Sequence, residues 1–228
     1  MDKGSFREGA KAALPIVLGY LPVGMTFGIL ARKAGLTSFE VGLMSLFVYA
    51  GASQFLAIEM ISKGIPNFSI ILATFFINLR HILMSSNLSI YLRNVRIPLL
   101  SLLSAQMTDE SYAVAISKLT WVKNKPHYLL GLQIISQLAW VGGTVAGALF
   151  SSLATSTGWG LPFALSALFI CLLVLQIKNA HHFWVMVVAG SISVFFKWAL
   201  PGNWYILLTA LFASGMGMMF ERVWRKNS

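Results

Sequence analysis

An arginine near the middle of a long apolar run constrains this chain more than any other feature of its sequence. Residues 67–91 are mostly apolar, and Arg80 lies in the polar stretch Asn78-Leu79-Arg80-His81 near the centre of the run. A run of this length can span a bilayer. A charged side chain at the bilayer centre costs about 2.5–3.5 kcal/mol on insertion scales, so it is seldom kept without a partner or a water-filled cavity. The sequence therefore predicts a membrane protein whose function resides in a polar interior.

The composition of the whole chain agrees with a membrane protein. Of the 228 residues, 57% are hydrophobic and 11% are charged, whereas soluble domains carry roughly 25% charged residues. Apolar runs recur from Ala12 to Phe220, and they lack the short alternating segments of a membrane β-barrel. These features exclude a soluble fold and predict an all-α, polytopic membrane helix bundle.

The apolar runs define candidate transmembrane spans. They cover residues 12–31, 40–62, 67–91, 98–117, 129–153, 160–178, 180–199 and 203–221. The fourth run contains Gln106, Thr108, Asp109 and Glu110, so a re-entrant or broken segment is an alternative to a full crossing there. Such a segment is tolerated only where it is buried in protein or lines water. The sequence therefore predicts about seven or eight transmembrane segments, with discontinuous helices.

The basic residues indicate the orientation of the chain. Its net charge is +10, and the basic residues cluster at the ends of apolar runs, which favours an orientation signal over nucleic-acid binding. With eight spans and the N-terminus inside, eleven basic residues lie on the inner side and five on the outer side. We therefore expect both termini to be cytoplasmic. The first apolar run, at about twenty residues, is too long for a signal peptide, so we expect it to remain as a span.

The two halves of the chain contain a similar glycine motif. Gly24-x-x-x-Gly28 near the start of the first half is matched by Gly143-x-x-x-Gly147 in the second. Many transporters consist of two repeats with a substrate site between them, so a single transmembrane domain, 1–228, with repeat halves of about 10–115 and 125–225 is one interpretation. The alternative is that the glycine pairs serve close helix packing.

Pro15 and Pro22 lie in the first span. A proline removes a backbone donor, so a discontinuous helix here could expose backbone groups to a cavity. A simple kink, stabilised by neighbouring helices, is the alternative.

The polar residues of the third run lie on two helical faces. Asn78 and His81 share one face, and Arg80 and Asn87 share another. A helix that is polar on two faces cannot turn either of them to lipid, so we expect this helix inside the bundle. Arg80 there either handles substrate or protons directly, or forms a fixed ion pair that holds two helices together.

Few acids could balance Arg80, because the chain has only seven. Asp109 and Glu110 lie well inside the fourth run, whereas Glu59 lies near the end of the second and could reach the interface. Adjacent residues on a helix point about 100° apart, so we expect at most one of the two acids to face Arg80. A carboxylate in a membrane interior can carry protons. The alternative is that Asp109 and Glu110 cap a helix.

Other polar residues follow helical spacing. Gln54 lies in the small-residue stretch Gly51-Ala52-Ser53-Gln54-Phe55 and offers both a donor and an acceptor. The fifth run carries a polar or small stripe, which favours a helix–helix contact over a ligand site: Gln133, Gln137, Trp140, Thr144 and Gly147. The chain has one cysteine, Cys171, and neither a metal-ligand motif nor a catalytic motif. We therefore expect no enzyme activity, no metal site and no cofactor.

Three segments together resemble a known family. They are the proline- and glycine-containing opening span, the stretch Tyr49-Ala50-Gly51-Ala52-Ser53-Gln54-Phe55, and Asn78-Leu79-Arg80-His81-x-Leu83-Met84 followed by Thr108-Asp109-Glu110. In this order and spacing the chain is similar to the AzlC/YgaZ family, the large subunit of bacterial branched-chain amino acid exporters. The resemblance covers nearly the whole chain and is firmest over residues 10–115.

The resemblance implies a function and a partner. It implies export of leucine, isoleucine and valine across the bacterial cytoplasmic (inner) membrane, together with a small membrane subunit of the AzlD/YgaH type. Proton coupling is compatible with it. An amino acid zwitterion needs a cation or helix N-terminus, an acid or carbonyls, and an apolar wall. Arg80 could attract the carboxylate, and Asp109 or Glu110 the ammonium group. We expect Gln54, Asn78, Arg80 and His81 to bind substrate, and Asp109, Glu110 and Glu59 to serve ion or proton coupling.

Two alternatives to this function remain at the level of the sequence. One is export of another class of small solute, such as other amino acids, organic acids or cations. The other is a membrane subunit that does not itself transport. An intramembrane enzyme is disfavoured, because no nucleophile–base pair or metal-ligand spacing is present.

Overall fold

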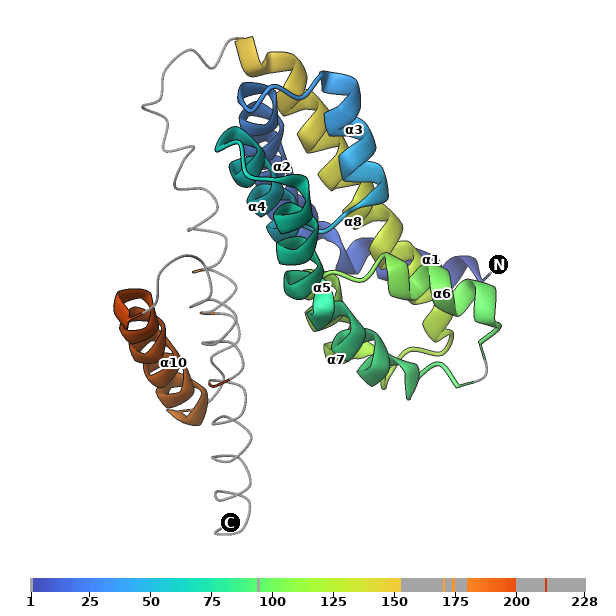
Figure 1. The fold of residues 1–228 in the computed structure, drawn as a ribbon. Coiled ribbons are helices and arrows are strands. Elements are labelled where there is room, and N and C mark those ends of the chain that lie inside the picture. The colour runs from blue at the N-terminus through green and yellow to red at the C-terminus, as the bar shows by residue number, and fades with distance from the viewer. Residues whose placement is uncertain are drawn as a thin grey trace. The chain divides into compact units, whose positions relative to one another are not determined.

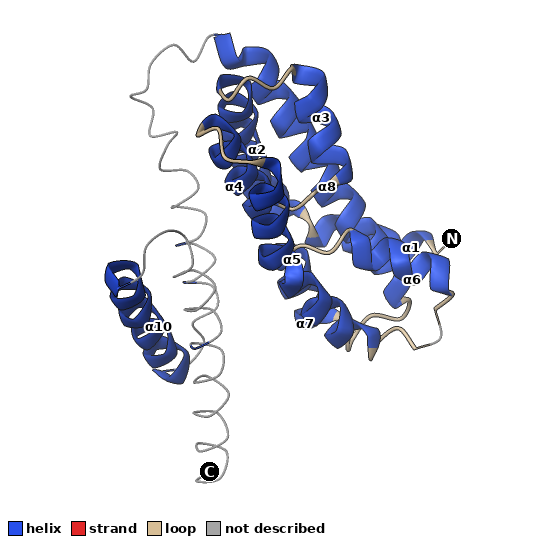
Figure 2. Cartoon of the chain, in the orientation of Figure 1, coloured by secondary structure: helices blue, strands red, loops and turns tan. Residues whose placement is uncertain are grey.

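The chain forms helices throughout the part that the structure describes. This computed structural model describes residues 2–93, 95–152, 170, 174, 180–199 and 212. Every regular element in these residues is helical (Figure 2). The chain divides into two compact units, Met1–Leu168 and Phe169–Ser228, which are described separately. The predicted all-α membrane fold is confirmed.

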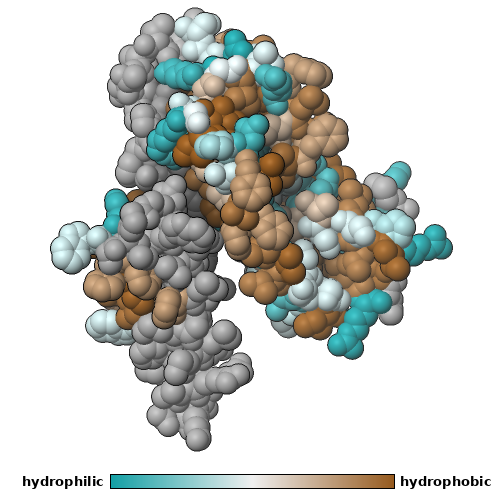
Figure 3. Space-filling view, in the orientation of Figure 1, coloured by the Kyte–Doolittle hydropathy of each residue, from teal (hydrophilic) through white to brown (hydrophobic). Residues whose placement is uncertain are grey.

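Three helices of the first unit are long and apolar enough to cross a bilayer. They are α2 (Leu14–Lys33), α5 (Asn67–Ser89) and α8 (Lys125–Leu149), which a 3-10 turn, η1 (Phe150–Ser152), extends (Figure 1). At 1.5 Å per residue, a 20-residue helix spans about 30 Å, the thickness of a hydrocarbon core. These helices correspond to the first, third and fifth predicted spans. Hydrophilic side chains gather toward the ends of this unit and apolar ones between them (Figure 3).

Helices α2 and α8 pack through the two Gly-x-x-x-Gly pairs. A Cβ added to Gly28 would overlap the carbonyl oxygen of Thr144, and a Cβ added to Gly147 would overlap that of Met25. Gly24 and Gly143 lie one helical turn earlier in the same contact. The contacts advance in the same direction along both helices, so α2 and α8 run parallel. The close-packing interpretation of the glycine pairs is confirmed, and the repeat stays a prediction.

A short helix precedes α2. Helix α1 (Lys3–Ala12) begins at Asp2, whose carboxylate accepts hydrogen bonds from the backbone N–H groups of Gly4 and Ser5. It packs against the start of α8, where a Cβ on Gly9 would overlap the carbonyl oxygen of Tyr128. The basic N-terminal segment is therefore held at the end of the unit where α8 begins.

The predicted span 40–62 is two helices rather than one. Helix α3 (Ser38–Phe47) begins with a Thr37–Glu40 capping box. Gly42 lies against Val145 of α8, whereas the carbonyl of Leu46 accepts a hydrogen bond from Gln137, two turns earlier on α8. Helix α3 therefore runs antiparallel to α8 and ends near the middle of α8.

Helix α4 (Gly51–Ser62) turns back toward the end where α3 began. Its first residue, Gly51, lies against the indole of Trp140, and Phe55, one turn later, packs its ring on Phe27 of α2. The direction reverses at Tyr49, which has φ of +40°. The prediction of a single crossing over 40–62 is wrong, because this left-handed residue converts the apolar run into a re-entrant hairpin.

The predicted span 98–117 is also a hairpin. Helix α6 (Ile97–Ala105) runs parallel to α8, with Leu103 bonded to Gln133 and Gln106 bonded to Gln137. Helix α7 (Asp109–Lys118) returns beside the last turns of α5, where the Tyr112 hydroxyl donates to Asn87. The segment is therefore broken rather than a single helix, as the alternative prediction has it.

The two hairpins enter the unit from opposite ends. The α3–α4 hairpin enters where α2 ends, and the α6–α7 hairpin enters where α8 begins (Figure 1). Their tips, residues 48–50 and 106–108, meet beside the middle of α2 and α8. Helices α3 and α4 contain 10 and 12 residues, or about 15–18 Å each, half of a bilayer core. The tip of each hairpin, where its two helices are separated, therefore lies at mid-membrane depth.

The second unit contains helix α10 (Ala180–Ala199), which matches the predicted span 180–199. Phe196 contacts Phe195 and Phe212, with ring centroids 5.9 and 5.5 Å apart. The predicted spans 160–178 and 203–221 fall almost entirely outside the residues that the structure describes.

Candidate functional site

The two hairpin tips meet around a buried tyrosine of α2. The Tyr20 hydroxyl lies 2.8 Å from Thr108 Oγ1 and 2.6 Å from Glu110 Oε2. Tyr20 is 7% exposed, and its ring packs edge-on against Trp140 of α8 at 5.3 Å. A hydroxyl has one hydrogen to donate, so Tyr20 donates to one of these two groups and accepts from the other. Helix α2 is thereby joined to the start of α7.

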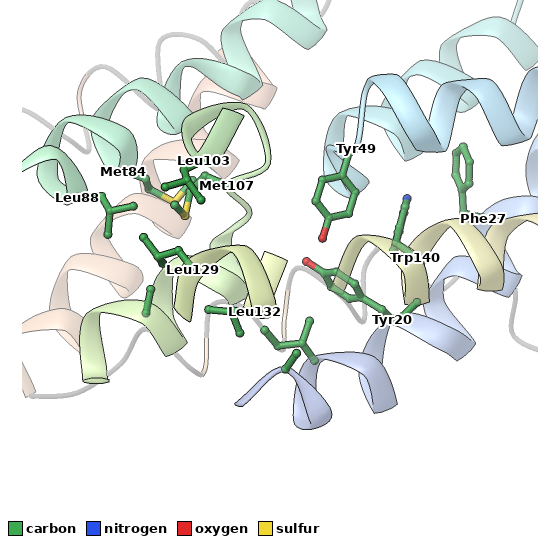
Figure 4. Packing of buried hydrophobic residues seen from close by; sticks show 14 of the residues in the cluster. Tyr20, Phe27, Tyr49, Met84, Leu88, Leu103, Met107, Leu129, Leu132 and Trp140 are labelled. Atoms are coloured by element: carbon green, nitrogen blue, oxygen red, sulfur yellow. The ribbon is translucent and has the colours of Figure 1, made fainter. Parts of the chain in front are cut away.

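The other tip contributes Tyr49. This residue is 4% exposed, and its hydroxyl has no hydrogen-bond partner among the residues that the structure describes. Figure 4 shows the hydroxyls of Tyr49 and Tyr20 pointing toward one another. A non-glycine residue in the left-handed region costs about 1–3 kcal/mol and persists where the surroundings enforce it. The packing of the hairpin tip thus holds an unpaired hydroxyl inside the polar cluster.

An ion pair joins α5 to α7 beside this cluster. Arg80 Nη1 lies 2.7 Å from Asp109 Oδ2, and the two side chains are 31% and 20% exposed. The Nε of Arg80 is buried and has no partner among the described residues. Of the two adjacent acids, Asp109 therefore faces Arg80 and Glu110 faces Tyr20. The structure brings all three charged residues together at the start of α7.

Gln54 and Asn78 lie near the same breaks. Gln54 is fully buried; its Oε1 accepts from Trp140 Nε1 at 3.0 Å, and its Nε2 lies 3.4 Å from Ser45 Oγ. Asn78 Nδ2 donates to Ser53 Oγ at 3.1 Å. Gln54 therefore connects α3, α4 and α8, whereas Asn78 connects α5 to the first turn of α4.

The remaining predicted site residues lie in different surroundings. His81 is half-buried and follows Arg80 on α5. Glu59 lies in the last turn of α4, exposed, with Glu59 Oε1 2.6 Å from Lys63 Nζ. The structure therefore places His81 beside the cluster and does not bring Glu59 to it.

Two glutamines of α8 bind the ends of the broken helices. Gln137 Nε2 donates to the Leu46 carbonyl of α3 at 3.0 Å, and its Oε1 accepts from Gln106 Nε2 at 2.7 Å. Gln133 Nε2 donates to the Leu103 carbonyl of α6 at 2.8 Å. Helix C-termini leave carbonyls unpaired, and within a membrane these need protein partners. The polar stripe of α8 is a helix contact, as the sequence favours, and it also caps both hairpins.

We expect the Gln137→Leu substitution to destabilise the protein. It leaves the Leu46 carbonyl and the Gln106 amide without their partner, and an unsatisfied buried polar group costs about 1–3 kcal/mol. Thermal unfolding in detergent, followed by size-exclusion chromatography, should show a lower midpoint. The Leu138→Ala substitution, at the adjacent exposed position, is the control. An equal midpoint for Gln137→Leu and Leu138→Ala would contradict the capping role.

Tyr20 and Tyr49 are functional candidates that the sequence analysis does not select. A signal for Tyr20 is present, since tyrosines of membrane helices favour the interfaces and this one lies near the middle of a predicted span. The same signal marks Tyr49, which lies near the middle of the predicted span 40–62, whereas its left-handed backbone is visible only in the structure.

The arrangement suits a small solute that carries both charges. It offers an arginine, two acids, hydroxyls and the start of α4, whose N-cap residue, Ala50, provides no side-chain cap. The N-terminus of a helix attracts anions. Aromatic rings of Phe27, Phe55 and Trp140 pack on one another beside these groups. A zwitterion with an apolar side chain matches this chemistry.

Comparison with known proteins places the chain in a family. The family model described as "AzlC protein" matches residues 15–154. An uncharacterized membrane protein of Archaeoglobus fulgidus is 40% identical over 179 residues, covering 77% of this chain and 78% of that protein. The inner membrane protein YgaZ of Escherichia coli (strain K12) is 33% identical, covering 77% of this chain and 74% of YgaZ.

A more distant relative is named as a transport protein. The branched-chain amino acid transport protein AzlC of Bacillus subtilis (strain 168) is 25% identical over 214 residues, covering 93% of this chain and 84% of that protein. No solved structure matches the chain.

Proposed function

Because the chain belongs to the AzlC family, whose model covers residues 15–154, we propose that it exports branched-chain amino acids across the bacterial cytoplasmic membrane. The observation that carries the proposal is the meeting of two oppositely directed hairpins at a charged, polar cluster of mid-membrane depth. Broken helices that meet at this depth are typical of substrate sites in secondary transporters. The relationship to a branched-chain amino acid transport protein supports the substrate class.

Different groups at the hairpin tips would bind different parts of the amino acid substrate. The carboxylate would be attracted by Arg80 and by the N-terminus of α4, and the ammonium group by Asp109 at the start of α7. The aliphatic side chain would lie against the aromatic rings beside Trp140. Because Arg80 is already paired with Asp109 at 2.7 Å, a substrate carboxylate would compete with Asp109 for the guanidinium. Binding and opening of this ion pair are thereby linked.

The hairpins keep the proposed orientation of the termini and change the side of the membrane on which the loops at Lys63 and Arg93 lie. With both hairpins re-entrant, one end of the first unit carries eight basic residues, Lys3, Arg7, Lys11, Arg93, Arg96, Lys118, Lys123 and Lys125. The other end carries three, Arg32, Lys33 and Lys63. The positive-inside rule assigns the first set to the cytoplasm. Three further crossings at the spans predicted after residue 160 would return the C-terminus to that side.

A small membrane subunit of the AzlD/YgaH type is part of the proposal. The family resemblance supports it, and its contribution can be measured by adding or omitting the partner. A membrane subunit that does not itself transport is the second candidate, because several relatives are described only as membrane proteins.

Transport by vesicles that contain the purified protein tests the proposed function. We expect labelled isoleucine, leucine and valine to exchange across the membrane when the small partner is present. The Arg80→Ala and Asp109→Asn substitutions should each lower this flux at least tenfold, because each leaves a partly buried charge without its partner.

Lys33→Ala, at an exposed end of α2, is the control for loss of a basic side chain. Folded Arg80→Ala and Asp109→Asn proteins with normal flux would refute their assignment. No flux of any branched-chain amino acid in the wild-type protein, with or without the partner, would refute the proposed function.

A further inference from the structure

We propose that Glu110 is a proton-binding site that couples the proposed export to a proton gradient, with the hydroxyls of Tyr20 and Tyr49 accommodating its two charge states. The inference rests on the proposed function and deepens it, since it assigns the coupling ion and separates the roles of the two adjacent acids. It follows from the hydrogen-bond inventory of the cluster where the hairpin tips meet.

The first step concerns the bond that Glu110 already has. Tyr20 Oη lies 2.6 Å from Glu110 Oε2 and 2.8 Å from Thr108 Oγ1. Because each hydroxyl carries one hydrogen, the direction of this chain depends on the charge of Glu110. When Glu110 is charged, Thr108 donates to Tyr20 and Tyr20 donates to Glu110; when Glu110 is neutral, its carboxyl donates to Tyr20 and Tyr20 donates to Thr108.

The second step concerns the hydroxyl that remains. Tyr49, at 4% exposure, has a buried hydroxyl without a partner in the described residues, and it points toward Tyr20 (Figure 4). A buried polar group left unpaired costs about 1–3 kcal/mol. A neutral carboxylic acid is satisfied by few partners, whereas a buried carboxylate needs several donors. The cluster therefore contains one hydroxyl bonded to Glu110, that of Tyr20, and one unpaired hydroxyl, that of Tyr49. A carboxyl group that alternates between neutral and charged forms requires such a second donor.

The third step concerns the charged groups around Glu110. Arg80 is paired with Asp109 at 2.7 Å, so it is not a dedicated countercharge for Glu110, and Asp109 carries the same charge as Glu110. His81 of α5 lies beyond Arg80, α2 contributes Tyr20, and the α3–α4 tip contributes Tyr49. The side chains of α8 nearest the tips are uncharged, namely Gln133, Gln137 and Trp140. Asp109 is thus fixed by an ion pair, whereas the Glu110 carboxyl is bonded to the Tyr20 hydroxyl and to no charged side chain among the described residues.

The fourth step distinguishes two possible ligands of Glu110, a proton and the ammonium group of a substrate. Tyr20 and Tyr49 are 7% and 4% exposed, and Tyr20 is in direct hydrogen-bond contact with Glu110. An ammonium group would have to separate these side chains. A proton requires only that hydroxyl hydrogens reorient along the chain that Thr108 and Tyr20 form. Glu110 itself is partly exposed, but the buried tyrosines close the side on which it is bonded, and this packing favours the proton.

Two transport modes of the full chain, with its small partner in vesicles, test the inference. Exchange of labelled for unlabelled leucine at equal pH requires no net proton movement, whereas accumulation driven by a pH gradient does. We expect the Glu110→Gln substitution to lower gradient-driven accumulation at least tenfold and to leave exchange within about threefold of wild type. Glu40→Gln, the same change in the exposed capping box of α3, should preserve both modes.

The Tyr49→Phe substitution provides a second readout. It removes the unpaired hydroxyl while retaining the ring, so the charged form of Glu110 loses a donor. We expect exchange to persist and the midpoint of the pH profile of gradient-driven transport to move to higher pH. Normal gradient-driven accumulation by Glu110→Gln, or an unchanged pH profile in Tyr49→Phe, would overturn the inference.

The remaining outcomes separate this inference from the proposed function. If Glu110→Gln abolishes exchange while the protein stays folded, Glu110 binds substrate and the inference is wrong. Wild-type exchange that does not respond to a pH gradient would also overturn it, while the proposed function would stand. An absence of wild-type exchange for all branched-chain amino acids would refute the proposed function and this inference together.

Discussion

The Gly147→Ala and Gly28→Ala substitutions are expected to destabilise the protein strongly, although each adds only one methyl group. A Cβ at either position would overlap a backbone carbonyl oxygen of the facing helix. Backbone cannot move aside as a flexible side chain does, so α2 and α8 must separate. Overpacking costs about 1–3 kcal/mol, occasionally more, and this contact also positions Tyr20 and Trp140. We expect poor recovery of folded protein and a lower thermal midpoint in detergent.

The same helices offer matched controls for this prediction. Gly19 of α2 and Gly142 of α8 are exposed, and an added Cβ would meet nothing within 4 Å. Alanine is favoured over glycine within helices by about 1 kcal/mol, so Gly19→Ala and Gly142→Ala should preserve or raise the midpoint. Equal behaviour of the two pairs of variants would contradict the close α2–α8 contact.

The second prediction with a large expected effect concerns the side of the membrane on which Lys63 and Arg93 lie. If α3–α4 is re-entrant, Lys63 lies on the same side of the membrane as Arg32, and Arg93 on the side of Lys3. If residues 40–62 crossed the membrane, both assignments would reverse. Single cysteines introduced by Lys63→Cys and Arg93→Cys, in a chain with Cys171→Ser, distinguish the two. A membrane-impermeant maleimide should label Lys63→Cys on intact cells and Arg93→Cys only after permeabilisation.

The controls separate topology from orientation. Arg32→Cys and Lys3→Cys have the same relative assignment under either topology. Labelling of Lys63→Cys together with Lys3→Cys, rather than with Arg32→Cys, would refute the re-entrant hairpin. A reversal of all four variants together would preserve the hairpins and refute the proposed orientation alone.

The sequence predicts the long helices well and the hairpins poorly. The spans at 67–91 and 129–153 agree with α5 and α8 to within a few residues, because length and hydropathy suffice for a helix that crosses. Residues 40–62 are as apolar and as long, yet they reverse at Tyr49. The reversal depends on one backbone angle, φ of +40°, which L-residues adopt only where packing enforces it. The polar residues at 106–110, in contrast, indicate the second break.

The charged part of the site follows from the sequence, whereas its hydroxyls do not. Arg80 needs a countercharge inside the membrane, and only seven acids are available, so Asp109 and Glu110 are strong candidates. Which acid meets Arg80 depends on the rotation of α7. Tyr20 comes from a helix about ninety positions earlier, and no local spacing links it to Glu110. The prediction that groups Glu59 with them gains no structural support, because α4 turns away from the cluster before that residue.

The hydrogen bond between Gln137 and the Leu46 carbonyl has a consequence for how the protein is made. Its two residues are 91 positions apart, and ribosomes add about 5–20 residues per second. The α3–α4 hairpin is therefore synthesised roughly 5–20 seconds before the helix that caps its break. In that interval neither half-helix is long enough to integrate into lipid as a stable span. Biogenesis must therefore shelter the hairpin, in the insertion machinery or a membrane chaperone, until α8 emerges.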